Sequence, residues 1–439
     1  MRMVRGALTA VACLALVTSG AARGSDAPAP SPEKLERITA FFNDEVTSGR
    51  IPGAAILIQQ HGKPVYLKTF GYRDVTTKSP MRPDTMFALH SMTKPITSVA
   101  FMMLVEEGKV ALDEPVAKYI PEWKNLGVFV AGTAPAFLTR APTRPMQIVD
   151  LLRHTSGLTY GFQQRSNVDA AYREKKIGEV IKAGTLDSMI EDLAKIPLEF
   201  SPGEAWNYSV STDVLGYLVG KIAGMPFEQF LKERIFKPLG MNDTDFFVPA
   251  DKVHRFAACY SADPQGGFNP LAAERKGTLT LQDDPTTSSF LSPPSLVSGG
   301  GGLCSTAADY LTFCRALLNG GELGGVRLLG PKTLKLMASN HLPGGVDLPA
   351  MSRSMFAEAA YNGIGFGLGF AVTMHPAQTL IAGSPGEFNW GGAATTSFFI
   401  DPAEELITIF MTQVLPSSAY PLRRELRTMV YAAITESNL

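Results

Sequence analysis

The two ends of this chain carry the alternation of β-strands, and its middle carries the spacing of helices. Near the N-terminus, residues 54–60 and 64–70 alternate like two strands, with the tight turn of a hairpin at His61-Gly62. Strand patterns return near the C-terminus, over residues 366–373, 379–382, 395–400 and 406–413. The economical arrangement is one antiparallel sheet to which both ends contribute strands.

Helical patterns lie between and around these strands. They cover residues 31–49, 147–154, 186–196, 209–223, 227–236, 305–318 and 421–434. We therefore predict one α/β domain, residues 31–110 and 290–439, built around the antiparallel sheet. A mostly helical domain, residues 111–289, is inserted between its two parts. A ligand site is expected at the junction of the two domains.

One stretch near this junction carries chemistry. Ser91-Met92-Thr93-Lys94 stands before an apolar run, residues 96–105, that is apolar on nearly every face and therefore typical of a buried helix. Pro95 fits only the first turn of a helix, so the helix should begin close to Ser91, at the positive end of its dipole. Residues three apart share a face, which brings the Ser91 hydroxyl near the Lys94 amine. A neutral amine there can take the hydroxyl proton and make the serine a nucleophile without histidine.

The Ser-x-x-Lys pattern is short, and Ser31-Pro32-Glu33-Lys34 also matches it. We interpret Ser31 as an N-cap before a proline in the first helical position. Tyr208 is a further candidate, between the Ser201-Pro202-Gly203 turn and a helix, because a hydroxyl beside a cation can relay protons. The alternative is a half-buried aromatic side chain whose hydroxyl is satisfied.

Two glycine-rich stretches are also candidates. Trp390-Gly391-Gly392-Ala393 opens or lies on a strand, where glycine weakens pairing unless something must approach the backbone closely. Free N–H groups at an exposed strand edge can donate to an oxyanion, and the alternative is a β-bulge. The glycine run at residues 299–302 lacks the Gly-Lys-Ser/Thr ending of a phosphate-binding loop, so we exclude nucleotide binding. We expect this run to let a loop pack tightly near the site.

The N-terminus has the pattern of a secretory signal. Arg2 and Arg5 precede an apolar core at residues 7–17, and Ala22-Arg23-Gly24 offers small residues at which a signal peptidase cuts. We therefore predict that residues 1–24 are a signal peptide and are removed. The mature chain, with no integral membrane segment, would be secreted or periplasmic in a bacterium.

Other features exclude several classes of function. The six histidines have no metal-ligand spacing, so no metal or other cofactor is expected; His61 is interpreted as a turn residue and His154 as a structural one. No Gly-x-Ser-x-Gly motif occurs, which argues against an α/β-hydrolase. The net charge of −1 implies no nucleic-acid or anionic-membrane partner. Cys259, Cys304 and Cys314 are expected to be buried free thiols, with a Cys304–Cys314 bridge as the alternative.

Taken together, these motifs resemble a known family. Ser91-Met92-Thr93-Lys94, Tyr208 and Trp390-Gly391-Gly392 fall in the order and at the separations of the three motifs of class C β-lactamase-related serine hydrolases. The segments at residues 151–158 and 301–310 also resemble that family, so the resemblance covers nearly the whole mature chain. It implies the α+β fold of β-lactamases and penicillin-binding proteins, an antiparallel sheet flanked by helices plus an inserted, mostly helical domain.

Two departures from the lactamase pattern indicate a subfamily. The lactamases carry Tyr-x-Asn, and here the third position is Val210; they carry Lys-Thr-Gly on the strand, and here it is Trp390-Gly391-Gly392. In that family the asparagine holds the amide of a β-lactam and the lysine faces its carboxylate. The combination found in this chain resembles the family VIII carboxylesterases, which implies a small-molecule ester as substrate.

The resemblance also implies a mechanism. Ser91 would attack an ester carbonyl, with Lys94 and Tyr208 together as general base, and water would then release the acid from the acyl-enzyme. The N–H groups of Ser91 and Ala393 would form the oxyanion hole, with Trp390, Gly391 and Gly392 beside the substrate. Either Lys94 is neutral or Tyr208 is ionised, and the sequence does not decide between them.

Three alternatives stay open. One is a class C-like β-lactamase or a D-Ala-D-Ala peptidase, against which the two departures count. Another is a non-catalytic relative that binds cell-wall peptides, which an intact Ser91, Lys94 and Tyr208 oppose. The third is acyl transfer to an alcohol other than water. Acyl-chain preference and oligomeric state are not indicated by the sequence.

Overall fold

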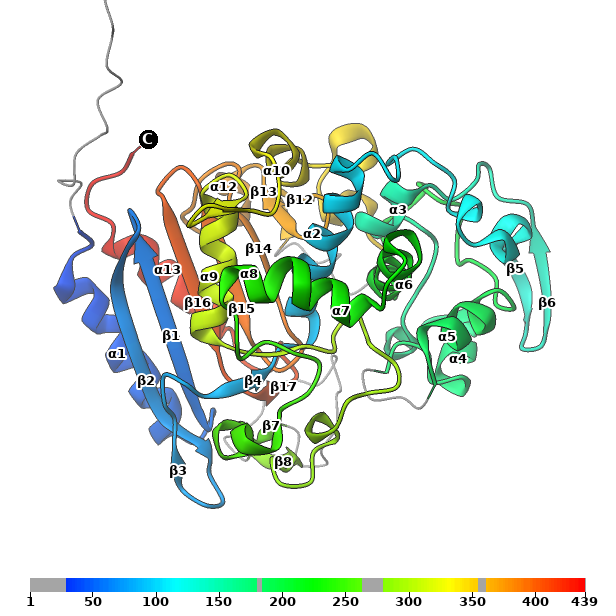
Figure 1. The fold of residues 1–439 in the computed structure, drawn as a ribbon. Helices are drawn as coiled ribbons and strands as arrows, with labels where there is room; N and C mark the ends of the chain where they lie inside the picture. The colour runs from blue at the N-terminus through cyan, green and yellow to red at the C-terminus, as the bar shows by residue number, and fades with distance from the viewer. Residues whose placement is uncertain (1–28, 180–183, 263–278, 354–360, 439) are drawn as a thin grey trace, which may run out of the picture.

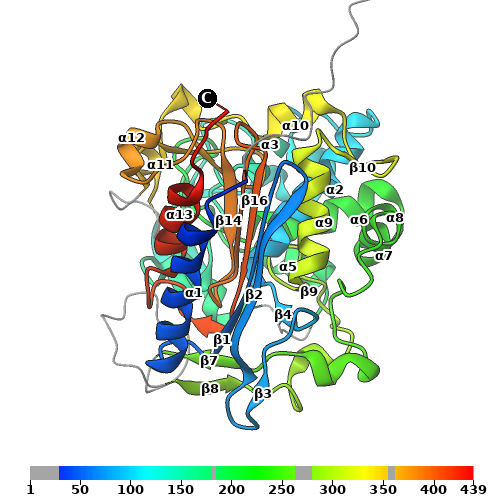
Figure 2. The same cartoon turned by 90° about the vertical axis from the view of Figure 1, so that its left-hand side faces the viewer.

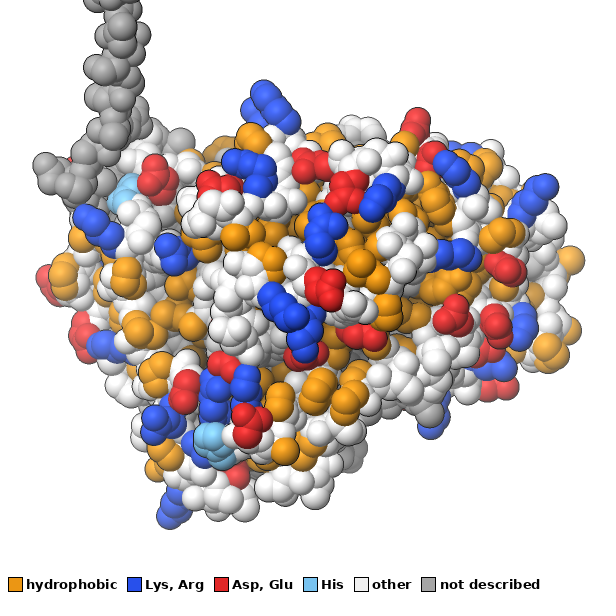
Figure 3. Space-filling model, in the orientation of Figure 1, with side chains coloured by type: hydrophobic (Ala, Val, Ile, Leu, Met, Phe, Trp, Pro, Cys, Tyr) orange, Lys and Arg blue, Asp and Glu red, His pale blue; other side chains and the backbone are white. Residues whose placement is uncertain are grey.

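The computed structural model describes residues 29–179, 184–262, 279–353 and 361–438. The predicted signal peptide, residues 1–24, lies outside the described residues, and its removal stays a prediction. In the part of the chain that is described, no helix is both long and apolar enough to cross a bilayer. On the face drawn in Figure 3, basic and acidic side chains are interspersed.

An eight-stranded antiparallel sheet forms the centre of the fold, in the order β12-β13-β14-β15-β16-β1-β2-β3. Its strands are β1 (Gly53–Gln60), β2 (Lys63–Asp74), β3 (Ser79–Pro80), β12 (Ile364–Phe366), β13 (Ala371–Thr373), β14 (Phe388–Gly391), β15 (Ser397–Asp401) and β16 (Leu406–Met411). Strand β1 pairs with β16, for example Leu57 opposite Ile409. The two ends of the chain are therefore joined in one antiparallel sheet, as predicted.

Helices cover both faces of this sheet (Figures 1 and 2). On one face lie α1 (Pro32–Thr47) and α13 (Leu422–Ala433), and Phe42 of α1 packs on Phe410 of β16 with 5.2 Å between ring centroids. On the other face lies α9 (Ala307–Leu318), whose Tyr310 packs on Phe398 of β15 at 5.2 Å. Every residue of β1 is buried because both of its faces are covered.

The helix α2 (Thr93–Glu106) joins the sheet to the helical part of the chain. It packs against α6 (Ser211–Ala223) and is buried from Thr93 to Leu104, as its apolar sequence predicts. The other helices are α3 (Ile148–Leu152), α4 (Asn167–Glu174), α5 (Leu186–Leu193), α7 (Phe227–Leu231), α8 (Lys237–Leu239), α10 (Pro331–Met337), α11 (Leu348–Met351) and α12 (Pro376–Thr379). The helix α7 continues through a π-helical turn, Lys232–Phe236, into α8.

Smaller strand pairs lie outside the large sheet. They are formed by β4 (Met86–Ala88) with β9 (Cys304–Thr306), β5 (Val128–Thr133) with β6 (Ala136–Arg140), β10 (Glu322–Leu323) with β11 (Val326–Arg327), and β7 (Cys259–Ser261) with β8 (Thr280–Asp283) and β17 (Val414–Leu415). The region at residues 111–289 thus contains strands beside its helices. The domain boundaries at residues 110 and 290 stay predictions.

Two strand predictions are wrong in detail. Residues 366–373 form parts of two strands, β12 and β13, because Gly369 with a φ of +110° reverses the chain, a conformation that glycine adopts readily. Residues 379–382 do not form a strand. A proline begins the single helical turn α12 there, and Leu380 follows in the left-handed conformation with its side chain 80% exposed.

Candidate active site

Ser91 stands where the chain turns from a strand into a buried helix. Strand β4 is held against β9, the N–H of Leu89 donates to the carbonyl of Leu303 at 2.9 Å, and the short 3-10 turn His90–Met92 leads into α2. His90 enters that turn with a φ of +47°. Ser91 is therefore fixed at the N-terminal end of α2, with its side chain half-buried.

The Lys94 side chain joins Ser91 to the glycine run at residues 299–302. Its Nζ donates to Ser91 Oγ at 3.2 Å and to the carbonyl oxygen of Gly300 at 2.6 Å. The same Nζ lies 4.6 Å from the ring centroid of Tyr208 and 5.3 Å from that of Tyr160. With only 1% of Lys94 exposed, its amine is held among groups that fix its position. Ser91, Lys94 and Tyr208, named from the sequence, are thus neighbours.

Tyr208 belongs to an aromatic cluster on the buried side of the site. Its ring centroid lies 5.0 Å from that of His154, 5.3 Å from that of Tyr160 and 5.5 Å from that of Trp390. The Gln163 amide donates to the Tyr208 carbonyl at 2.9 Å and fixes the backbone just before α6. Sequence reasoning missed Tyr160 and Gln163, because no motif distinguishes them.

Trp390 and Gly391 lie on β14, and Trp390 is buried against Tyr208. A Cβ on Gly391 would collide with the guanidinium of Arg423, at the start of α13. That guanidinium donates to the carbonyl oxygens of Gly392 at 2.5 Å and Thr396 at 2.8 Å. Arg423 therefore fixes the turn after β14, and its role was not evident from the sequence.

The end of β14 contacts the segment that carries Ser91. A Cβ on Gly392 would collide with the carbonyl oxygen of Leu89, and the Thr396 hydroxyl donates to that same oxygen at 3.2 Å. The Gly392 N–H is used within the turn, since it donates to the Thr396 carbonyl at 2.8 Å. Among the described residues, the Ala393 N–H in this turn has no backbone acceptor. An N–H that no backbone carbonyl occupies can donate to a ligand oxygen.

Two histidines lie near Lys94, and the pKa of each is lowered, so both are neutral at pH 7. Burial, helped by the positive charge of Lys94, lowers the pKa of His90 to about 4. The same two causes lower the pKa of His154 well below its ordinary value. His154 lies in the left-handed turn after α3, with its Nδ1 3.2 Å from Ser209 Oγ. This geometry fits the structural role predicted for His154.

The turn after α3 is held by a buried carboxylate. Asp150 is fully buried and accepts hydrogen bonds from Arg144 at 2.6 and 2.8 Å, from Arg153 at 3.0 Å and from the Thr155 hydroxyl at 2.8 Å. Burial alone would favour the neutral carboxyl group. The Arg144 hydrogen bonds, the N–H of Gln147 and the two cations outweigh burial, and the pKa of Asp150 is lowered.

We expect Asp150→Asn to destabilise the fold by about 3 kcal/mol at pH 7, because it leaves the partly buried arginines without their counter-charge. The folded-state pKa of Asp150 lies below its unfolded value, so its stabilisation is present above pH 3.8 and is lost as the pH falls through the folded-state pKa. Urea unfolding at pH 7 and pH 3 measures the free energy of unfolding. The difference in this free energy between the wild type and Asp150→Asn should be smaller at pH 3. The control is Asp251→Asn, at an exposed position. An equal loss of unfolding free energy in both variants would contradict the stabilising role assigned to Asp150.

The described residues offer no evident metal site. Among them, no group of three or more His, Cys, Asp or Glu side chains is arranged to hold a metal ion. Cys259, Cys304 and Cys314 are buried free thiols, as favoured from the sequence, and burial raises the pKa of Cys259 to about 12.

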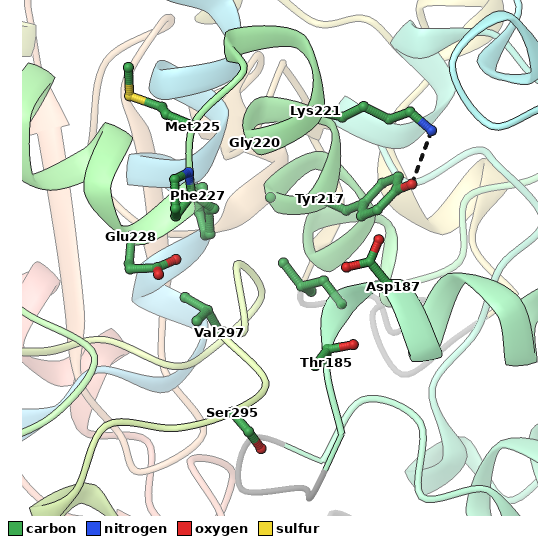
Figure 4. A pocket seen from close by; sticks show the side chains of 13 residues that line it. Thr185, Asp187, Tyr217, Gly220, Lys221, Met225, Phe227, Glu228, Ser295 and Val297 are labelled. Carbon is green, nitrogen blue, oxygen red and sulfur yellow. Dashed lines mark hydrogen bonds between the residues drawn. The ribbon is translucent and has the colours of Figure 1, made fainter.

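A separate cavity of about 460 Å³ lies along α6, between the starts of α5 and α7 (Figure 4). Neither Ser91, Lys94 nor Tyr208 lines it. Along α6, the Lys221 amine donates to the Tyr217 hydroxyl at 3.1 Å. The residues that line it are Thr185, Leu186, Asp187, Gly216, Tyr217, Gly220, Lys221, Met225, Pro226, Phe227, Glu228, Ser295 and Val297.

The fold and the Ser-x-x-Lys site define a class, the serine hydrolases related to β-lactamases. Comparison with known proteins agrees, since the Beta-lactamase family profile matches residues 38–432. An uncharacterised protein of Mycobacterium tuberculosis, MT1414, is 36% identical over 386 residues, which cover 87% of this chain and 90% of that protein. Esterase EstB of Burkholderia gladioli is 32% identical over 409 residues, 90% of this chain and 95% of the esterase.

A solved structure is also similar to this chain. EstCE1, described as a hydrolase with promiscuous acyltransferase activity, superimposes with a TM-score of 0.75 at 27% identity, over 91% of this chain and 98% of EstCE1. The chain belongs to the Beta-lactamase family. It is a serine ester hydrolase of that family, close to the family VIII esterases, and the predicted α+β fold is confirmed.

Proposed function

We propose that this protein is a carboxylesterase that hydrolyses short-chain esters through an acyl-enzyme on Ser91. The observation that carries the proposal is the 3.2 Å hydrogen bond between Lys94 Nζ and Ser91 Oγ, at the end of a buried helix. A serine in such contact with a buried amine has a proton acceptor in reach without a histidine. The neutral histidines nearby are then not needed as the general base.

The proposed reaction has two steps, acylation of Ser91 and hydrolysis of the acyl-enzyme. Ser91 Oγ attacks the ester carbonyl carbon while its proton passes to the pair formed by Lys94 and Tyr208. The tetrahedral intermediate collapses, the C–O bond to the alcohol breaks, and the pair returns the proton to the leaving alcohol. Water then attacks the acyl-enzyme with the same pair as base, and the acid leaves with Ser91 restored.

The oxyanion of each tetrahedral intermediate would be bound by the N–H groups of Ser91 and Ala393. Both lie at backbone positions fixed by tertiary contacts, Ser91 by the start of α2 and Ala393 by the turn that Arg423 and Thr396 hold. Donors fixed in advance need no reorganisation when negative charge develops. The glycines at 391 and 392 let this turn approach the nucleophile.

The choice of substrate is supported by what surrounds Tyr208. Trp390 lies on β14, packs on Tyr208 and offers no positive charge to a substrate carboxylate. Val210, buried just before α6, offers no amide to hold a lactam side chain. An apolar wall favours uncharged acyl and alcohol groups through burial of their surface.

We expect kcat/KM for p-nitrophenyl butyrate to exceed that for benzylpenicillin and nitrocefin by tenfold to a hundredfold or more. A hydrogen bond to a charged group contributes roughly 1.5–3 kcal/mol, and this site lacks that contact with a lactam carboxylate. Weak activity on nitrocefin fits the proposal, because its ring is strained and the nucleophile is intact. A value for either lactam equal to that for the ester would favour the lactamase alternative.

A further inference from the structure

Gly300 lies between the Lys94 amine and a buried carboxylate, that of Asp213. Its carbonyl oxygen accepts from Lys94 Nζ at 2.6 Å, and its N–H donates to Asp213 Oδ1 at 3.0 Å. A Cβ on Gly300 would collide with Asp213 Oδ2, so only glycine fits here. The glycine run that the sequence singled out therefore places one residue in hydrogen-bond contact with both groups.

Asp213 is held firmly in this position. It lies in the first turn of α6, is 2% exposed, and also accepts from the Ser298 hydroxyl at 2.6 Å. Burial raises the pKa of Asp213, and the charge of Lys94 and the hydrogen bonds from Ser298 and Gly300 offset only part of that rise. The positive end of the α6 dipole also favours an anion there.

We propose that Asp213 is a positioning residue for the hydrolysis: through Gly300 it holds Lys94 against Ser91, and its negative charge stabilises the proton that Lys94 and Tyr208 take up. This inference rests on the proposed function. A proton that leaves Ser91 adds positive charge to the Lys94–Tyr208 pair, and a carboxylate in the same buried cluster lowers the energy of that state. The carboxylate stabilises the protonated pair in the same way whether the Lys94 amine or the Tyr208 phenol accepts the proton.

Three other titratable groups face this cluster. His90 and His154 lie near Lys94, and burial together with the charge of Lys94 lowers the pKa of His90 to about 4 and that of His154 well below its ordinary value. Burial, with the charge of Asp213 as the next cause, raises the pKa of Tyr160 well above its ordinary value. The acidic limb of the kcat/KM profile is therefore compared between the wild type and a variant that lacks the Asp213 charge.

The test is the pH profile of kcat/KM for p-nitrophenyl butyrate in Asp213→Asn, together with the rate at which a fluorophosphonate labels Ser91. Asparagine keeps an oxygen for the Ser298 and Gly300 donors but removes the charge. We expect the plateau to fall at least about tenfold and the acidic limb to move to lower pH by about one unit, because protonation of the pair becomes less favourable. A merely structural aspartate would lower the rate at every pH without moving the limb, and that result would overturn the proposal.

The matched control is Asp309→Asn. Asp309 lies in the first turn of α9 and, like Asp213, accepts from a backbone N–H, that of Asp243 at 2.8 Å, and from a hydroxyl, that of Thr244 at 2.9 Å. Burial raises its pKa too, but Lys94 is not among the charges that act on it. In this variant we expect the acidic limb of the kcat/KM profile to lie at the same pH as in the wild type. A shift equal to that of Asp213→Asn would overturn the proposal.

A second variant decides the question if Asp213→Asn does not fold. Asp213→Ser removes the same charge with a smaller side chain that keeps a polar oxygen, and it should move the acidic limb of the kcat/KM profile to lower pH, as Asp213→Asn does. An unmoved acidic limb in a folded Asp213→Ser would then overturn the proposal. Failure of the proposed function itself looks different, because wild-type Ser91 would then not be labelled at all.

Discussion

Ser91→Ala is expected to lower kcat for p-nitrophenyl butyrate by on the order of a thousandfold or more while the protein stays folded. Loss of the nucleophile removes the covalent route, and what remains is binding and the oxyanion donors. The half-buried Ser91 side chain contacts Lys94 and can be shortened without opening a large cavity. Initial rates, with circular dichroism and thermal unfolding as the check on folding, measure this.

The matched control is Ser31→Ala, the serine of the other Ser-x-x-Lys sequence. Its hydroxyl caps α1 by accepting from the Lys34 N–H at 3.4 Å, so its loss should cost about 1 kcal/mol of stability and no activity. An inactive Ser31→Ala beside an active Ser91→Ala would show that the nucleophile has been misassigned.

Lys94→Ala and Tyr208→Phe should each lose about a hundredfold to ten-thousandfold in kcat, and the double variant should be little worse than either. Lys94 Nζ lies 3.2 Å from Ser91 Oγ and 4.6 Å from the Tyr208 ring centroid, so the two side chains serve one proton transfer. Groups that act as a unit are not additive. Phenylalanine keeps the ring packing on Tyr160 and Trp390, so the loss in Tyr208→Phe isolates the hydroxyl.

A double-mutant cycle of kcat/KM at fixed pH measures the coupling between the two residues. Lys94→Met, which keeps most of the buried volume, is the control for packing loss in Lys94→Ala. Losses that multiply fully would show that the two groups act independently. Near-normal activity of Tyr208→Phe would make Tyr208 only a packing residue.

Local patterns in the sequence were enough to predict the elements whose shape depends on near neighbours. The capping serine and proline place the start of α1, and the alternation with His61-Gly62 places the first hairpin, β1 and β2. The proline after Lys94 places the start of α2, so the Ser91–Lys94 contact could be expected as well. The strand predicted at residues 379–382 is absent because Pro376, just before it, favours a helical turn.

The rest of the site depends on contacts between distant parts of the chain. Lys94 and Gly300 are 206 residues apart, and Thr396 and Leu89 are 307 apart. No period or short motif encodes such pairs, so Asp213, Tyr160 and the role of the glycine run emerge only from the fold. Tyr208 and Trp390 were candidates from their local sequence, and only the family resemblance joined them to Ser91 and Lys94 in one site.

If Ser91 forms the covalent intermediate, an irreversible serine probe should react with it. The protein is incubated with a fluorophosphonate probe, digested, and the labelled residue located by peptide mass, with Ser91→Ala treated in parallel. We expect one label per chain on Ser91 in the wild type, formed more slowly in the presence of p-nitrophenyl butyrate, and no label in the variant. A label on another residue, or equal labelling of Ser91→Ala, would contradict it.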